Sequence, residues 1–163
     1  MEGNKNKPRA LLVFGAPCSG KTTFAEKFAK KFGLVFYNLD EIVEAGDFSR
    51  KGLLVLLEQI TKTGNTLVLE GGLNTEKDRK EIIKSFRKWG YDPSLIWIQT
   101  DISTIRVRMK AKYKTVAKAK ELLEQKSAEL EAPSEAEKPI ILSGKHTFET
   151  QTKHVLAGLA DGS

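Results

Sequence analysis

The chain alternates short apolar runs with longer segments in which apolar residues recur at helical spacing. The short runs are typical of buried strands and lie at residues 10–14, 35–39, 66–70, 95–100 and 139–142. The segments of helical period lie at residues 20–32, 51–63, 75–89, 103–131 and 148–159. Strands that alternate with helices form parallel sheets covered by those helices. The pattern therefore predicts an α/β fold.

Residues that favour helix ends support these boundaries. Gly33 follows the first helical segment and suits a left-handed terminator, and Gly64 ends the second. Thr75 and Asp78 resemble a capping box, with Asp in place of the usual Glu or Gln. No internal repeat and no long linker interrupts the pattern, so we expect residues 1–163 to form one domain.

Composition narrows the class of protein. Hydrophobic residues make up 40% of the 163 residues, which suits a chain with a real core. The formal net charge of +6 suits an anionic partner such as a nucleotide, a nucleic acid or an acidic metabolite. A lone cysteine, Cys18, rules out an internal disulfide and a zinc site built from four cysteines, and predicts a reducing cytoplasm.

Neither a membrane span nor a secretory signal is expected. No apolar run approaches the roughly 20 residues that cross a bilayer. The run at 10–14 follows Lys7 and Arg9 as a signal segment would, but it is shorter than the apolar part of such a segment. A buried strand explains it better.

One contiguous motif carries the clearest chemistry. Residues 15–22 satisfy G-x-x-x-x-G-K-[ST], directly between an apolar strand and an amphipathic helix. Such a loop turns its backbone N–H groups toward phosphate oxygens, with a lysine on the β/γ-phosphates and a hydroxyl on magnesium. We therefore expect ATP and Mg²⁺ as cofactors; the alternative is a turn that binds nothing. The predicted nucleotide-binding residues are Gly15, Ala16, Pro17, Cys18, Ser19, Gly20, Lys21, Thr22 and Thr23.

Within this motif, Lys21 is the predicted phosphate contact and Thr22 the predicted magnesium ligand. Cys18 is either a small space-filling residue or a reactive thiol, and the first interpretation is favoured.

Three carboxylates end predicted strands, where ligands bind in open α/β sheets. Asp40 follows the second strand and either faces the transferred phosphoryl group or caps the next helix. Glu70 ends the third strand at the place of a metal-organising carboxylate. Asp101 ends the fourth strand and competes for that role, although a helix cap is the favoured interpretation.

Two sets of basic side chains are candidates for function: Arg79 alone, and a run after the fourth strand. Arg79 falls in the first turn of a predicted helix, where the dipole disfavours a cation, so a ligand or ion-pair role is expected. We predict that it helps to hold an anionic acceptor or a phosphate. A second group lies after the fourth strand, where a solvated helix face is the alternative to function. Its members are Arg106, Arg108, Lys110, Lys112 and Lys114. His146 and His154 lack partners at metal-ligand spacing.

These residues resemble the small P-loop kinases, specifically the zeta-toxin-like and polynucleotide-kinase-like group of AAA-type ATP-binding domains. The likeness covers most of residues 9–159 and rests on the phosphate loop, Asp40, Glu70 followed by Asn74 and Arg79, and the arginine-bearing stretch after strand four. It implies a five-stranded parallel sheet of order 2-3-1-4-5 with helices on both faces.

The same resemblance implies roles for single residues. Asp40 matches the base or orienter of the acceptor hydroxyl, and Arg108 matches a lid arginine that stabilises the migrating phosphoryl group. Lys112 stands in the place of a second lid arginine and is expected to contact substrate. Val43 replaces an arginine that polynucleotide kinases tend to carry, which argues against a polynucleotide 5′-hydroxyl acceptor. We place the lid at about residues 104–138.

We therefore predict an ATP- and Mg²⁺-dependent phosphotransferase acting on a small hydroxylated or nucleotide-like acceptor. Two alternatives remain: a nucleotide-binding switch that hydrolyses slowly, and a nucleic-acid-associated P-loop protein that uses the basic run. A GTPase is disfavoured because the chain contains no N-K-x-D guanine signature.

Overall fold

A five-stranded parallel sheet forms the centre of the computed structural model, which describes residues 7–113 and 115–162. Its strand order is β2-β3-β1-β4-β5, and every neighbouring pair is parallel. The predicted α/β fold and strand order are therefore confirmed. The strands are β1 Arg9–Gly15, β2 Val35–Asn38, β3 Leu67–Glu70, β4 Asp92–Gln99 and β5 Ile140–Ser143.

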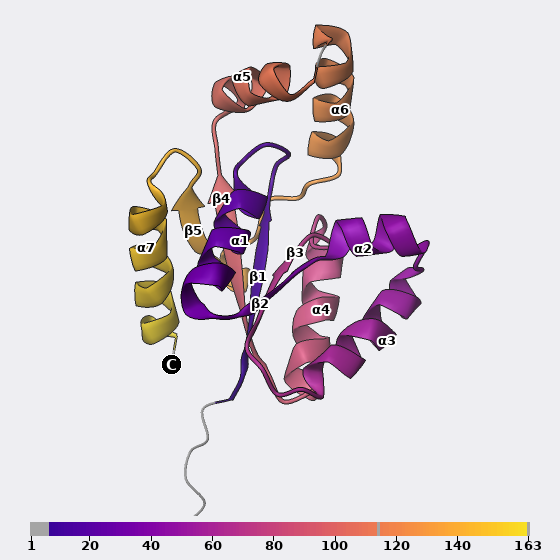
Figure 1. The fold of residues 1–163 in the computed structure, drawn as a ribbon, viewed down its shortest axis with the longest axis vertical. Coiled ribbons are helices and arrows are strands. Elements are labelled where there is room, and N and C mark those ends of the chain that lie inside the picture. The colour runs from indigo at the N-terminus through magenta and orange to yellow at the C-terminus, as the bar shows by residue number, and fades with distance from the viewer. Residues whose placement is uncertain (1–6, 114, 163) are drawn as a thin grey trace, which may run out of the picture.

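Helices cover both faces of this sheet (Figure 1). One face carries α1 (Lys21–Phe32) and α7 (Phe148–Asp161), and the other carries α3 (Arg50–Thr61) and α4 (Glu76–Lys88). Across the residues that the structure describes, no helix has both the length and the apolar character needed to cross a membrane.

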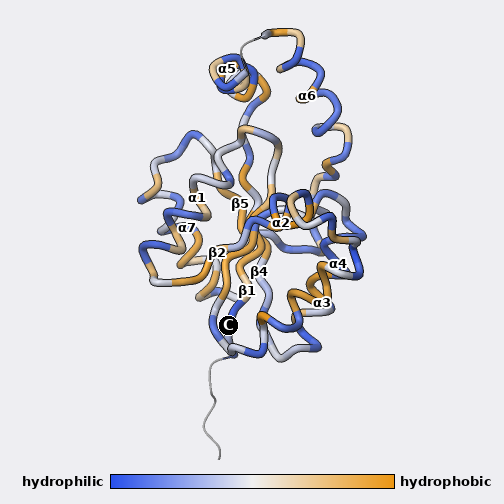
Figure 2. Tube along the Cα trace, turned by 45° about the vertical axis from the view of Figure 1, so that its right-hand side comes forward, coloured by the Kyte–Doolittle hydropathy of each residue, from blue (hydrophilic) through white to orange (hydrophobic). Residues whose placement is uncertain are grey.

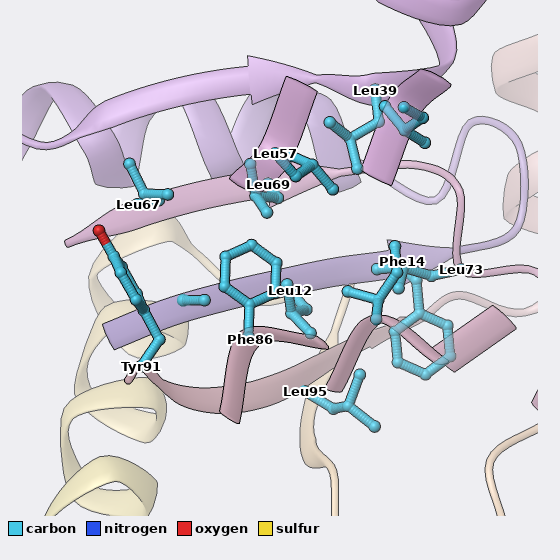
Figure 3. Packing of buried hydrophobic residues seen from close by; sticks show 13 residues of the cluster. Leu12, Phe14, Leu39, Leu57, Leu67, Leu69, Leu73, Phe86, Tyr91 and Leu95 are labelled. Carbon is cyan, nitrogen blue, oxygen red and sulfur yellow. The ribbon is translucent and has the colours of Figure 1, made fainter. Parts of the chain in front are cut away.

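The two faces of β1 supply two hydrophobic clusters. Leu12 and Phe14 join the cluster with α3 and α4, which Figure 3 shows from close by. Leu11 and Val13 join the cluster with α1 and α7. Because successive strand residues point to opposite faces, a strand buried on both sides is apolar throughout. Figure 2 accordingly shows the hydrophobic colour concentrated in the strands at the centre.

Local signals placed several helix ends correctly. Gly33 takes a left-handed conformation (φ 64°), and its N–H donates to the carbonyls of Ala29 and Lys30. Thr75 and Asp78 form the reciprocal capping box that the sequence predicted, with Thr75 Oγ1 accepting from the Asp78 N–H at 3.1 Å.

Two helical features differ from the expectation. A short helix, α2 (Leu39–Gly46), follows β2 directly and is capped by Asn38 rather than Asp40. The stretch expected as one long helix is two, α5 (Ile102–Lys112) and α6 (Val116–Ala128), packed together through a small apolar cluster. In Figure 1 this pair stands above the sheet. Lys114 lies outside the described residues.

The chain that returns from α6 to β5 is held against the rest of the protein, although it falls within the expected lid. The Glu131 N–H donates to the Asn74 carbonyl at 2.8 Å. The side chain of Glu137, in the 3₁₀ turn Glu135–Glu137, is 5% exposed. Although this segment is acidic, Glu137 is neutralised by Arg79. Residues 131–137 are therefore anchored, and the helical pair ends before them.

Candidate functional site

The phosphate loop joins β1 to α1 in a tight, partly left-handed turn. Cys18 and Gly20 have positive φ values of 57° and 98°, and the Ser19 N–H donates to the Ala16 carbonyl at 3.1 Å. Gly15 packs so closely that a Cβ there would lie 2.6 Å from the Ile98 carbonyl oxygen. The turn leaves the N-terminus of α1 facing open space, where unpaired backbone N–H groups favour an anion.

That space is a cavity of about 740 Å³. Most of the predicted loop residues line it, but Ser19 is fully buried and Ala16 packs beside the α5–α6 cluster instead. The cavity is within the ordinary range for ligand sites. Its other polar and charged lining residues include Asp40, Asn74, Arg108, Lys112, Lys126, Glu129 and His146.

Three polar groups converge at the base of the loop. The Thr22 hydroxyl donates to Glu70 Oε1 at 2.9 Å, and Lys21 Nζ lies 3.8 Å from the same oxygen. Glu70 is 3% exposed, and this burial raises the pKa of its carboxyl above the ordinary value, although Thr22 and Lys21 oppose the shift. Its Oε2 is buried and has no hydrogen-bond partner within the described part of the chain.

The Thr22–Glu70 pair fits a magnesium ion. Mg²⁺ prefers oxygen ligands and is usually held by one or two protein groups together with substrate phosphates and water. Thr22 Oγ1 and the orphaned Glu70 Oε2 are such oxygens. Over the ranges 7–113 and 115–162, no group of three or more His, Cys, Asp or Glu side chains could hold a metal on its own. Substrate phosphates would therefore have to complete the coordination.

Asp101 has a different role. Its carboxylate caps α5, accepting from the Thr104 N–H at 2.9 Å, and pairs with Lys145. The bonds from Lys145, Ser103 and Thr104 hold the pKa of this carboxyl well below its usual range. The favoured interpretation as a helix cap is confirmed, and Glu70 rather than Asp101 lies beside Thr22.

Asp40 is fixed at the opening of α2. Its Oδ1 accepts the Gly72 N–H at 2.9 Å, and a Cβ on Gly71 would lie 2.6 Å from the carboxylate carbon. Gly71 also has φ 91°, a conformation that L residues rarely adopt. The two glycines after Glu70 thus let the loop approach this carboxylate, which lines the cavity.

Arg108 of α5 bridges two loops of the cavity wall. Its Nη1 donates to the Cys18 carbonyl at 3.1 Å and its Nη2 to the Gly144 carbonyl at 2.9 Å. Lys112 also lines the cavity, with Nζ 5.7 Å from the centre of the Tyr113 ring. These two predicted lid cations are therefore brought to the same cavity as Lys21 and Asp40.

Arg79 does not reach this cavity, and the expectation that it binds an acceptor is wrong. The side chain is completely buried, and its Nε donates to Glu137 Oε1 at 2.6 Å. The remaining guanidinium N–H groups donate to Glu137 Oε2 and to the backbone carbonyls of Leu73, Asn74, Glu131 and Ala132. With every nitrogen engaged inside the protein, the ion-pair role is the correct one.

Several residues were not placed in the cavity by the sequence analysis. His146 was considered only as a metal ligand and Gly144 was not considered, yet both follow β5, so the strand-end argument that selected Asp40 and Glu70 would also have found them. Lys126 and Glu129 come from α6 and its C-terminal end and carried no such signal. His146 lies against His154, with ring centroids 5.8 Å apart.

A protein-family model matches most of the chain. Residues 11–135 match a family model described as an AAA domain (AAA_33). No curated protein sequence matches the chain.

Solved structures share the fold at low sequence identity. A gluconokinase from Sinorhizobium meliloti 1021 has a TM-score of 0.72 and 17% identity, covering 95% of this chain and 93% of that one. APS kinase CysC from Mycobacterium tuberculosis, in complex with AMPPNP and APS, has a TM-score of 0.65 and 16% identity, covering 94% and 98%. Shikimate kinase from Aquifex aeolicus has a TM-score of 0.57 and 17% identity, covering 94% and 97%. The fold is that of small P-loop kinases.

Proposed function

Since the chain belongs to the AAA domain family, we propose that it is an ATP- and Mg²⁺-dependent phosphotransferase acting on a small hydroxylated or nucleotide-like acceptor. One observation carries the proposal. Thr22 and Lys21 both converge on the buried Glu70, beside a cavity of about 740 Å³. The zeta-toxin-like or polynucleotide-kinase-like subgroup stays a prediction, as does a cytoplasmic location.

The nucleotide half of the site is assigned to the phosphate loop. Backbone N–H groups at the start of α1 bind the phosphates, and Lys21 neutralises charge on the β/γ-phosphates. Thr22 and Glu70 would hold Mg²⁺, which would neutralise charge on the nucleotide phosphates. Nucleotide then replaces the internal contact of Lys21 with the Ala16 carbonyl, which is long at 3.5 Å.

The acceptor half is assigned to Asp40 and the helical pair α5–α6. Asp40 orients the acceptor hydroxyl and accepts its proton, and the Gly72 N–H holds the carboxylate in place. Arg108 and Lys112 place positive charge on the phosphoryl group as it moves. We propose residues 102–130 as the lid, within a single domain that spans residues 1–163.

The polar lining of the cavity favours a kinase over a nucleotide switch. Asp40, Asn74 and Glu129 extend the polar lining beyond the phosphate loop, which provides a second polar region for an acceptor. The basic residues of α5 face two different sites. Arg108 and Lys112 line this cavity, whereas Arg106 and Lys110 line a separate groove on α5 and α6. A continuous nucleic-acid surface would instead use the run as a whole.

A panel of hydroxylated acceptors with γ-labelled ATP tests the proposal. Wild-type protein transfers label to at least one acceptor, and Lys21→Ala loses both transfer and MgATP binding while its circular dichroism spectrum is unchanged. Lys30→Ala is the matched control, because Lys30 is exposed at the far end of the same helix. Hydrolysis without transfer to any acceptor would favour the ATPase alternative, and normal MgATP binding by folded Lys21→Ala would refute the site.

A further inference from the structure

A single buried guanidinium joins three parts of the structure that surround the cavity. Arg79 contacts Leu73 and Asn74 in the loop after β3, and Glu131, Ala132 and Glu137 in the segment that returns from α6. Its carbon Cζ also lies 4.9 Å from the centre of the Phe14 ring. Phe14 directly precedes the phosphate loop in β1.

The returning segment is tied to the same loop by further bonds. The Asn74 carbonyl accepts both from Arg79 at 3.2 Å and from the Glu131 N–H at 2.8 Å. The Glu131 carboxylate in turn accepts the Glu76 N–H at 2.7 Å. Asn74 lines the cavity, so one carbonyl connects a cavity residue to the end of the helical pair.

Burial of the Arg79–Glu137 ion pair is poorly explained by its contribution to stability alone. Removing two charges from water is costly, and apolar residues of similar volume often replace a buried ion pair without loss of stability. An apolar pair, however, would donate no hydrogen bonds to the four backbone carbonyls that Arg79 holds. The arginine therefore supplies a fixed geometry that packing does not.

We propose that Arg79 is a positioning residue that fixes the C-terminal hinge of the lid to the Asn74 loop, so that lid closure over nucleotide is coupled to the placement of Asn74. This inference rests on the proposed function. The N-terminal end of the lid is also anchored, because the Thr100 hydroxyl donates to the Ser19 carbonyl and Asp101 pairs with Lys145. Motion between the hinges then carries α5 and α6 as one packed unit.

Hydrogen exchange with and without Mg²⁺ and AMPPNP tests the coupling. In the wild type, nucleotide slows exchange in the phosphate loop and in α6. In Arg79→Lys, the loop is still protected by nucleotide, but the added protection of α6 is lost and residues 131–137 exchange faster. Arg87→Lys is the matched control, because it makes the same change at an exposed position of the same helix.

A double variant removes both buried charges and covers the case in which Arg79→Lys fails to fold. Arg79→Met combined with Glu137→Met replaces the ion pair by an apolar pair. We expect it to unfold at a lower temperature than the wild type, because the four carbonyls that Arg79 holds lose their donor, and to lack the nucleotide-induced protection of α6 under conditions where it is folded. Normal protection of α6 in either folded variant would overturn the inference, and so would failure of both variants to fold, because Arg79 would then be purely structural. Absence of nucleotide protection in the wild-type phosphate loop would instead refute the proposed function.

Discussion

Replacing Thr22 by valine removes one hydroxyl from the base of the phosphate loop and little else. Valine has nearly the same shape, but the 2.9 Å hydrogen bond to Glu70 is lost. A hydrogen bond to a charged group contributes about 1.5–3 kcal/mol, and the penalty is greatest where the remaining partner is buried. Glu70 is 3% exposed and its other oxygen already lacks a partner within the described residues, so we expect a loss of about 2 kcal/mol.

Thermal unfolding followed by circular dichroism measures this loss. For a chain of this length, 1 kcal/mol corresponds to about 2–4 °C, so Thr22→Val should lower the Tm by about 4–8 °C. Mg²⁺ and AMPPNP at about 100 times Kd should stabilise the wild type by about 2.7 kcal/mol. The magnesium-dependent part of that gain disappears in Thr22→Val because the proposed ligand is gone.

Thr22→Ser is the control, since it keeps the hydroxyl and should retain both effects. The reasoning is refuted if Thr22→Val unfolds at the wild-type temperature and gains the same stabilisation from Mg²⁺ and AMPPNP. A lower Tm with full magnesium-dependent stabilisation would show that the hydroxyl bonds Glu70 but does not bind the metal.

Two further substitutions and one proteolysis experiment probe the rest of the site. Burial raises the pKa of Glu70, so the stability that belongs to its protonated form is lost as the pH rises through the folded-state pKa; calorimetry across pH should therefore show the Tm of Glu70→Gln rising relative to the wild-type Tm as the pH increases, together with a weaker magnesium effect. Asp40→Asn should lower kcat by about 10²–10⁴-fold with little change in nucleotide Kd, and a smaller loss in steady-state kinetics would leave Asp40 without a proton-transfer role. Trypsin should cut the lid at sites such as Lys118 and Lys126 more slowly with AMPPNP, and equal cleavage rates would contradict closure.

Most of the fold could be predicted because its signals are local. Each strand contains a short apolar run, although β4 begins three residues before its run, at Asp92. The end of α1 is marked by Gly33 and the start of α4 by the Thr75–Asp78 box. The phosphate loop is contiguous in sequence, so its chemistry required no knowledge of long-range contacts. Asp40 and Glu70 could also be selected, since a parallel topology brings the carboxyl ends of strands to one edge.

The helices that the sequence analysis missed or merged lack such local signals. α2 has only eight residues and begins where β2 ends, so neither a long periodic segment nor a loop between the two elements predicts it. Between Lys112 and Val116 there is no Gly or Pro to predict a break. The break instead lets Ile105 and Met109 of α5 pack against Leu123 of α6, which is a tertiary effect.

Arg79 shows most clearly where local reasoning stops. The helix dipole correctly implied that a cation in the first turn of α4 needs a partner, but it said nothing about which partner. Glu137 lies 58 residues further along the chain, in a segment whose acidic composition resembles solvated loop. A first-turn arginine is as well suited to a distant carboxylate as to a ligand phosphate, because both are anions that accept paired hydrogen bonds. The two cases are distinguished by whether the carboxylate is buried with the arginine. Glu137 becomes buried only because the chain that follows the lid packs across the Asn74 loop.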